Sequence, residues 1–326
     1  MTRSKMSKCD VVCVGSATVD TFLTIEQPFS SLKLGDKVLA RSADKRSGGG
    51  ATNSASALAK LGLKVRVATK VGNDDDGNFI LRDLKSYGVD NVCQSRSRQQ
   101  TDLATIISST KEKDRIILVH KGASTDLSPK DIPSSKLHCS WIYLATLTGK
   151  SFKTALHIAA LAKKKNIKLL FNPSLYLAQK GKKQLSGILQ NTTALVLNKE
   201  EAQAVLDTSS KSVEYLLTEL QKCGPHIVIV TDGKRGLYAL HENIMYSLTK
   251  TPNVKIVHTA GAGDAFTSGF LAGLIKQYSF DEALRLGQVN ASSVIQYVGA
   301  KNGQLTEREA TAMIKKYNLK ITTKRL

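Results

Sequence analysis

Residues 259–274 read TAGAGDAFTSGFLAGL, a loop of small residues followed by an apolar run. The loop at Gly261, Ala262 and Gly263 carries almost no side chains, so its backbone N–H groups can approach an anion closely. The apolar run predicts a helix, whose positive dipole end points at the same place. Asp264 stands at this helix start, where its carboxylate can accept a proton from a hydroxyl group. An anion site beside a base suits phosphoryl transfer to an alcohol, because that reaction depends mainly on positioning and charge stabilisation.

The same stretch also has an ordinary structural explanation. Glycine-rich helix starts are common, and an acidic residue in a first helical turn simply favours the helix dipole in most proteins. The functional interpretation therefore depends on what the rest of the chain places around this loop.

Composition indicates a globular protein. The chain has 326 residues, 41% of them apolar, which is enough for a substantial core. No apolar run reaches about 18 residues, so no membrane span is predicted. The basic start, residues 1–10, lacks the apolar core of a signal peptide, and a cytosolic location is expected. The five cysteines are scattered without a Cys-x-x-Cys pair, which favours free thiols over disulfides or a zinc site.

Charge is the one compositional extreme. The chain has 47 basic and 27 acidic residues, a net charge of +20, which raises the question of nucleic-acid binding. However, the basic residues are spread along the chain, and the longest run is only Lys163–Lys165. No basic–aromatic interleaving suggests a stacking platform for bases. A solvated lysine-rich surface is therefore favoured over a nucleic-acid groove.

Strand and helix patterns alternate over most of the chain. After an early strand at 10–14, strands are predicted at 141–144, 168–171, 194–197, 227–231 and 237–240, with helices between and after them. Such alternation predicts an α/β fold with a mostly parallel sheet and helices on both faces. The polar segment 22–45 and a predicted hairpin over 103–119 do not fit this alternation, and they predict a small accessory sheet.

Two polar segments in the first part of the chain are candidates for ligand contact. Three consecutive glycines, the last two of which are Gly49 and Gly50, precede a predicted helix of small residues that carries Asn53. A tight turn alone would explain the glycines, but they also allow close approach of a ligand, and Asn53 can pair with hydroxyl groups. Asp20 is by itself more typical of a turn or cap, although a carboxylate can hold two adjacent sugar hydroxyls.

Two further segments follow predicted strands in the second half. Asn198 and Glu201 have the spacing of a helix capping box, and Glu201 could in addition reach a magnesium ion. Thr231, Gly233 and Gly236 lie between two strands, where a plain hairpin turn is favoured. The functional alternative for this turn is contact with the phosphates of a nucleotide.

Together these segments resemble the PfkB/ribokinase family of carbohydrate and nucleoside kinases over nearly the whole chain, from Val11 to about Thr306. Five motifs occur in the family's order, ending at Asp20, Asn53, Glu201, Gly236 and Asp264. The resemblance implies a single ribokinase-like domain over residues 1–326. This domain is a three-layer α/β sandwich with a central, mostly parallel sheet flanked by helices. A small β lid is expected from segments of approximately 21–46 and 98–122.

The resemblance also implies roles for the matching positions. Asp264 resembles the catalytic base, and the small residues before it resemble the anion hole. On the acceptor side it implies Asp20, Gly49, Gly50 and Asn53. On the nucleotide side it implies Asn198, Thr231, Gly233, Gly236 and Asn290. Glu201 is implied to lie on the magnesium side.

One position departs from the family. The family usually has Asp where this chain has His258, and in ribokinase-like members that Asp helps build a monovalent-cation loop. A neutral imidazole supplies no such charge, which puts potassium activation in doubt and favours a packing role for His258.

The implied activity is transfer of the γ-phosphoryl group of ATP, with Mg²⁺, to a primary hydroxyl group of a sugar. A nucleoside kinase is the close alternative, since it shares every catalytic motif. It would need an apolar pocket for the base, for which Phe22 and Phe29 in the lid segment are candidates. A catalytically silent binding protein on the same fold is the third alternative, against which the intact Asp264 counts. In ribokinases the lid also serves as a dimer clasp, so a homodimer is implied.

Overall fold

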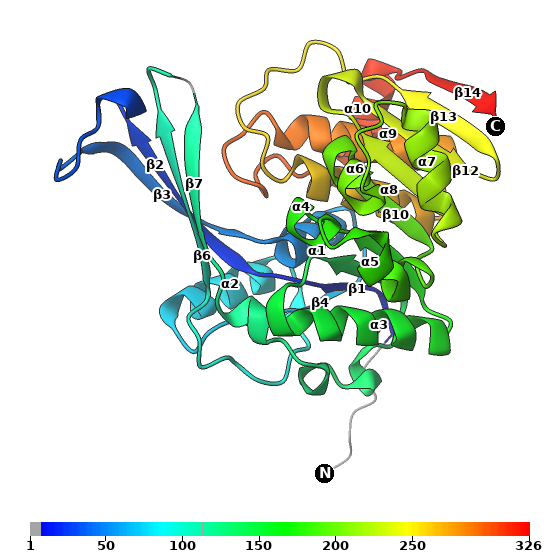
Figure 1. Ribbon diagram of the computed structural model, residues 1–326, viewed down its shortest axis with the longest axis horizontal. Coiled ribbons are helices and arrows are strands. Elements are labelled where there is room, and N and C mark those ends of the chain that lie inside the picture. The colour runs from blue at the N-terminus through cyan, green and yellow to red at the C-terminus, as the bar shows by residue number, and fades with distance from the viewer. Residues whose placement is uncertain (1–7, 113) are drawn as a thin grey trace.

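A computed structural model describes residues 8–112 and 114–326, and it divides them between two sheets (Figure 1). The basic start of the sequence, up to residue 7, lies outside the described residues. The main sheet contains ten described strands in the order β14-β13-β12-β11-β10-β9-β8-β1-β4-β5. Its central strands are parallel, and the three strands at the β14 end are antiparallel. The expected α/β sandwich with a mostly parallel sheet is confirmed.

The strands of the main sheet are short and, in the centre, mostly buried. They are β1 (Cys9–Val14), β4 (Val65–Ala68), β5 (Asp90–Asn91), β8 (Cys139–Ala145), β9 (Lys168–Asn172), β10 (Ala194–Asn198), β11 (Ile227–Thr231), β12 (Leu237–His241), β13 (Ile244–Leu248) and β14 (Ile321–Arg325).

Helices cover both faces of this sheet. One face carries α1 (Gly50–Lys60), α2 (Asp75–Ser86), α8 (Ala262–Ile275), α9 (Phe280–Val294) and α10 (Glu307–Tyr317). The other carries α3 (Phe152–Lys164), α4 (Leu175–Ala178), α5 (Gly181–Leu189), α6 (Lys199–Leu206) and α7 (Val213–Lys222).

Alternation along the central strands divides the apolar core in two. In β1, Val11 and Cys13 pack with the first helix layer, while Val12 and Val14 pack with the second. This is the period of two that a strand imposes, and a strand buried on both faces must be apolar throughout. No helix in the described part of the chain combines the length and the apolar character needed to cross a membrane.

A separate four-stranded sheet, here called the lid, projects from one side of the body (Figure 1). Its order is β3-β2-β6-β7, from β2 (Thr18–Ile25), β3 (Ala40–Gly48), β6 (Asp102–Ser109) and β7 (Arg115–His120). The expected hairpin is the antiparallel pair β6–β7. The other two strands lead directly into the candidate site, since β2 carries Asp20 and β3 ends at the triple glycine.

Candidate active site

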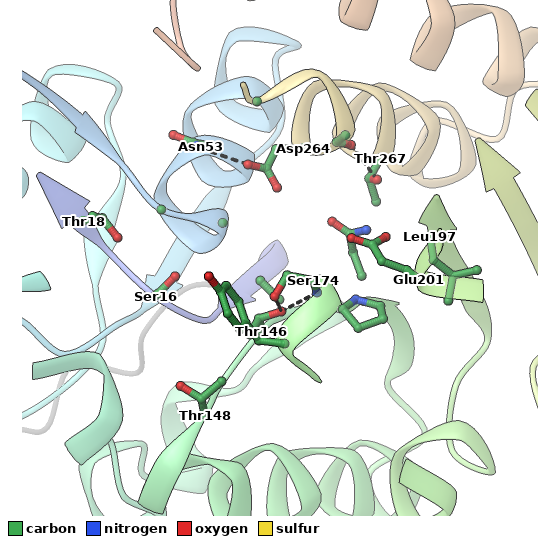
Figure 2. Close-up of a pocket in the computed structure, with 18 of the residues that line it drawn as sticks. Ser16, Thr18, Asn53, Thr146, Thr148, Ser174, Leu197, Glu201, Asp264 and Thr267 are labelled. Atoms are coloured by element: carbon green, nitrogen blue, oxygen red, sulfur yellow. Dashed lines mark hydrogen bonds between the residues drawn. The ribbon is translucent and has the colours of Figure 1, made fainter. Parts of the chain in front are cut away.

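A cavity of about 740 Å³ lies where the central strands end. Its walls include residues at or just after the carboxyl ends of β1, β8, β9, β10 and β11, and the lid strands border it from the other side. This is where open α/β sheets bind ligands. Figure 2 shows the polar side chains that converge on the cavity from these separate elements.

Asp264 and Asn53 meet at the centre of the cavity wall (Figure 2). The Asn53 amide Nδ2 donates a 2.9 Å hydrogen bond to Asp264 Oδ2. Burial raises the pKa of Asp264 to about 6, and the bond from Asn53 opposes this shift. A carboxylate with that pKa is ionised at neutral pH and still basic enough to take a proton, which is what a general base requires.

The anion loop, residues 259–263, forms the start of helix α8. Gly261 is its N-cap in a left-handed conformation, with φ of +79°. A Cβ atom at Gly261 would lie 2.5 Å from Ala300 Cβ, so both the backbone angle and the space require glycine here. The Ala262 N–H donates to the Thr259 carbonyl at 3.3 Å within the loop, so the N–H groups left for an anion in the first helical turn are those of Gly263 and Asp264.

The predicted acceptor residues line the same cavity. Gly49 has φ of +99°, and a Cβ atom there would lie 2.6 Å from the Ser16 carbonyl oxygen, so the turn cannot accept a side chain without shifting. Burial raises the pKa of Asp20 to about 6, against the opposing charges of Lys121 and Lys301. The structure thus brings Asp20, Gly49, Gly50 and Asn53 to one wall beside Asp264.

A second cavity of about 540 Å³ lies on the other side of the anion loop. Thr231 and Gly263 border both cavities, while Gly233, Gly236 and Ala262 line only the second. Asn198 borders the first cavity at the end of β10. The two cavities therefore meet at Gly263, which is the arrangement needed for two substrates that exchange a phosphoryl group.

Asn290 does not reach either cavity. Its side chain is fully buried, its Nδ2 donates to the Ala265 carbonyl at 2.8 Å, and its Oδ1 accepts from the Leu305 backbone at 3.0 Å. The structure therefore gives no support to the predicted contact of Asn290 with a nucleotide, because its polar groups are used to hold α8 against α9. The same helix reaches the second cavity through Gln288, Ala291 and Ser292 instead.

Glu201 closes the predicted capping box at the start of α6. Its Oε2 accepts from the Asn198 N–H at 2.8 Å, and Asn198 Oδ1 accepts from the Glu201 N–H at 2.9 Å. Glu201 also borders the cavity, and burial raises its pKa to about 7. The described residues contain no cluster of three acidic, histidine or cysteine side chains that could hold a metal alone. The Glu201 carboxylate alone still fits Mg²⁺, which proteins often bind through one or two carboxylates, with phosphates and water as its other ligands.

His258 is buried against the lid. Its ring meets Phe22 edge-on with 5.6 Å between ring centroids, and its Nδ1 accepts from the Ala260 N–H at 3.3 Å. Burial, helped by the charge of Arg115, lowers the pKa of His258, so the imidazole is neutral near pH 7. A neutral packed ring does not fit a monovalent cation that needs a carboxylate at this position.

Several residues that line the two cavities were not predicted from the sequence. Lys121 and Val119 reach the first cavity from the end of β7, and Thr146 and Ser174 reach it from loops after β8 and β9. In the second cavity they are Lys250, Thr251, Ile256 and Gln288. Thr146 follows a predicted buried strand, so the rule that ligands bind beyond strand carboxyl ends would have found it. Ser174 follows the predicted strand 168–171, so the same rule applies to it. The remaining residues give no local signal, because they arrive from a lid edge, loops and a helix face.

Comparisons with known proteins agree with this geometry. The family model described as pfkB family carbohydrate kinase matches residues 8–307. The chain is 27% identical to 5-dehydro-2-deoxygluconokinase of Shouchella clausii, over 95% of this chain and 97% of that one. The crystal structure of the nucleoside kinase of Methanocaldococcus jannaschii superposes with a TM-score of 0.80 at 23% identity, covering 96% and 99% of the two chains. Arabidopsis thaliana ribokinase complexed with ribose and ATP gives 0.81 at 20% identity, covering 95% and 99%.

The structural matches establish the fold, and the family model extends over nearly the whole chain. The glycine turns at Gly49 and Gly261, on either side of the Asp264 carboxylate, agree with that match. The chain belongs to the pfkB family of carbohydrate kinases, enzymes that transfer a phosphoryl group to an alcohol.

Proposed function

We propose that the protein transfers the γ-phosphoryl group of ATP to a primary hydroxyl group of a sugar, with Asp264 as general base. The observation that carries this proposal is the position of Asp264, between the acceptor turn at Gly49–Gly50 and the anion loop. Asn53 holds the carboxylate in place through its 2.9 Å hydrogen bond. An acceptor hydroxyl bound against Asp20 would then have the base on one side and the phosphoryl group on the other.

Charge stabilisation falls to the start of α8. Gly263 of the anion loop borders both cavities, so its N–H group lies at their junction, where the transferred group would lie. Such donors are typically worth about 2.7–4 kcal/mol each in a reaction that develops charge on oxygen. Asn198, Thr231, Gly233 and Gly236 are proposed to contact the nucleotide. Glu201 would hold Mg²⁺ beside its phosphates, where the ion neutralises developing charge.

The lining of the first cavity favours a sugar over a nucleoside. Phe22 packs against His258 rather than into the cavity, and Phe29 is absent from the lining. Tyr176 is the single aromatic side chain among the described lining residues, and it is largely exposed. A purine or pyrimidine would therefore find little of the flat apolar surface on which bases are usually held.

A substrate panel tests the acceptor. Purified protein with ATP and Mg²⁺ is offered ribose, fructose, 2-keto-3-deoxygluconate, adenosine, cytidine and inosine, and ADP formation is followed. We expect a sugar to give the highest kcat/KM. Turnover of nucleosides alone would show that the acceptor is wrong while the kinase assignment stands. Salt-dependent nucleic-acid binding without turnover of any acceptor would favour the silent binding protein.

The pH dependence of turnover follows from the two raised carboxyl pKa values. A general base works only when ionised, so kcat/KM for the acceptor is expected to fall as the pH drops through about 6, the pKa of Asp264. Asp20 titrates in the same range, which makes the decline steeper than about tenfold per pH unit. In Asp20→Asn the slope should return to about tenfold per unit. A rate that is constant down to about pH 5 would assign the base to another group.

Potassium is expected to have no specific effect. The neutral, packed His258 gives a cation no carboxylate at this position, so rates in potassium, sodium and tetramethylammonium chloride should agree at equal ionic strength. Initial rates with the best acceptor of the panel test this. Stimulation by potassium alone would contradict it.

We propose in addition that two lids associate to form a homodimer. The edge strand β7 carries Ile116, Ile117 and Leu118, each about half exposed, and an exposed apolar edge strand favours pairing with another chain. Light scattering should give the mass of a dimer. Leu118→Lys should give a monomer, whereas Leu34→Lys, at an exposed leucine in a lid loop, should remain dimeric. A monomeric wild type would contradict this proposal.

A further inference from the structure

Lys301 is a buried lysine that the proposed reaction does not use. It lies in the segment between α9 and α10 and is 8% exposed. Its Nζ donates to Ser47 Oγ at 2.8 Å and to Asp83 Oδ2 at 2.5 Å. Burying an ammonium group is costly unless partners compensate for the lost hydration, so these two contacts fix where the side chain lies.

The partners of this segment belong to the acceptor side of the site. Ser47 is in the last residues of β3, immediately before the glycine turn that lines the first cavity. Its neighbour Arg46 donates Nη1 to the Val298 carbonyl at 2.9 Å. A Cβ atom at Gly299 would lie 2.7 Å from Arg46 Cδ, which shows how closely the two segments pack. Two consecutive residues of β3 therefore hold residues 298–301.

The same segment supports the anion loop from behind. Ala300, next to Lys301, packs on Gly261 so closely that a Cβ atom there would lie 2.6 Å from Ala300 Cα. Upstream, the Ile295 carbonyl accepts from the N–H groups of Val257 and His258 at 2.8 and 3.1 Å. The middle of the anion loop and the two residues before it thus rest on the segment that Lys301 fastens to β3.

We propose that Lys301 is a positioning residue, whose ammonium group fixes the separation between the acceptor turn and the anion loop. This inference rests on the proposed function, since the separation matters only if an acceptor hydroxyl must line up with a phosphoryl group. A misplacement of about 1 Å in such a reaction costs on the order of 10²-fold in rate. Lys301 contacts neither reactant, because it lines neither cavity.

Lys301 also contributes to the charge around Asp20. The charged groups that act on Asp20 are Lys121 and Lys301, which favour its ionised form, and Asp264, which opposes it. Loss of the Lys301 charge therefore raises the pKa of Asp20 further, and the acid limb of the rate profile moves to higher pH. This shift reports the charge of Lys301 near the acceptor side of the site, while kcat and hydrogen exchange report its effect on position.

Lys70 provides a matched control. It is as buried as Lys301, its Nζ lies 2.9 Å from Asp131 Oδ2, and it lines neither cavity. The test compares Lys301→Met with Lys70→Met, using ATP and the best acceptor of the panel. Both variants should lose stability. Only Lys301→Met should lose roughly 10–10²-fold in kcat with unchanged affinity for ATP, and only there should the acid limb move to higher pH.

Ser47→Ala removes one contact of Lys301 and leaves the Asp83 pair intact, so it carries the test if Lys301→Met does not fold. A several-fold loss of kcat and faster hydrogen exchange in residues 257–266 are expected. If the wild type phosphorylates no acceptor, the proposed function fails, and hydrogen exchange of this segment tests the positioning alone. The inference would be overturned if the Lys301 and Lys70 variants showed the same hydrogen exchange in residues 257–266, or the same kcat and the same acid limb of the rate profile. If only Ser47→Ala folds, a kcat and a hydrogen-exchange rate equal to those of the wild type would overturn it.

Discussion

Replacement of Asp264 by asparagine should lower kcat by about 10²–10⁴-fold, because an amide cannot take the proton of the acceptor hydroxyl. The substitution preserves shape, and Asn53 can still bond the remaining carbonyl oxygen. Affinity for ATP, measured by calorimetry, should stay near the wild-type value because the anion loop is unchanged.

The stability of this variant provides the control. Burial raises the pKa of Asp264, so its ionised form destabilises the folded state at neutral pH. Asp264→Asn removes that buried charge, and its unfolding temperature should equal or exceed that of the wild type. A loss of activity is then not a loss of fold. Turnover within a fewfold of wild type in a well-folded variant would show that Asp264 is not the base.

The second large effect is expected for Gly261→Ala, with kcat lowered on the order of 10²-fold. The new Cβ atom would meet Ala300 at 2.5 Å, on a backbone with φ of +79° that non-glycine residues rarely adopt. The loop must shift, and its N–H groups would no longer point at the transferred group. Steady-state rates at saturating acceptor and ATP measure the loss.

Gly88→Ala is a control that separates the stability lost to an unfavourable backbone angle from the activity lost when the anion loop shifts. Gly88 has φ of +71° after α2, and nothing lies within 4 Å of a Cβ atom placed there. Gly88→Ala should lose the stability that the backbone strain alone costs, which is less than Gly261→Ala loses, and it should keep its kcat. If both glycine variants keep wild-type kcat, the donors of the anion loop are not needed for turnover.

Local sequence predicted the parts of the site that are built by backbone. Glycines with positive φ at Gly49 and Gly261 stand where a side chain would collide, and such positions show in the sequence itself. The capping box at Asn198 is likewise a local pattern, and the structure confirms it. The alternation of strands and helices predicted the α/β sandwich for a similar reason, since the period of each element is written in consecutive residues.

Side-chain direction was harder to predict, because it depends on tertiary packing. Asn290 carries the right chemistry for a nucleotide, yet it points between two helices. Phe22 lies on the lid but turns toward His258. Lys121 reaches the cavity from the end of β7, and the hairpin of β6 and β7 is placed in the lid by the pairing of β6 with the distant strand β2. No period in the sequence encodes these outcomes.

The hydrogen bond between Asn53 and Asp264 joins residues 211 positions apart in the chain. Contacts so distant in sequence form late, because loop closure costs entropy before the contact can repay it. During synthesis the acceptor turn emerges long before the base, so a growing chain can have half of a site and no chemistry. Recovery of activity after denaturation would therefore mark the completion of the longest-range contacts, while helix content would return earlier.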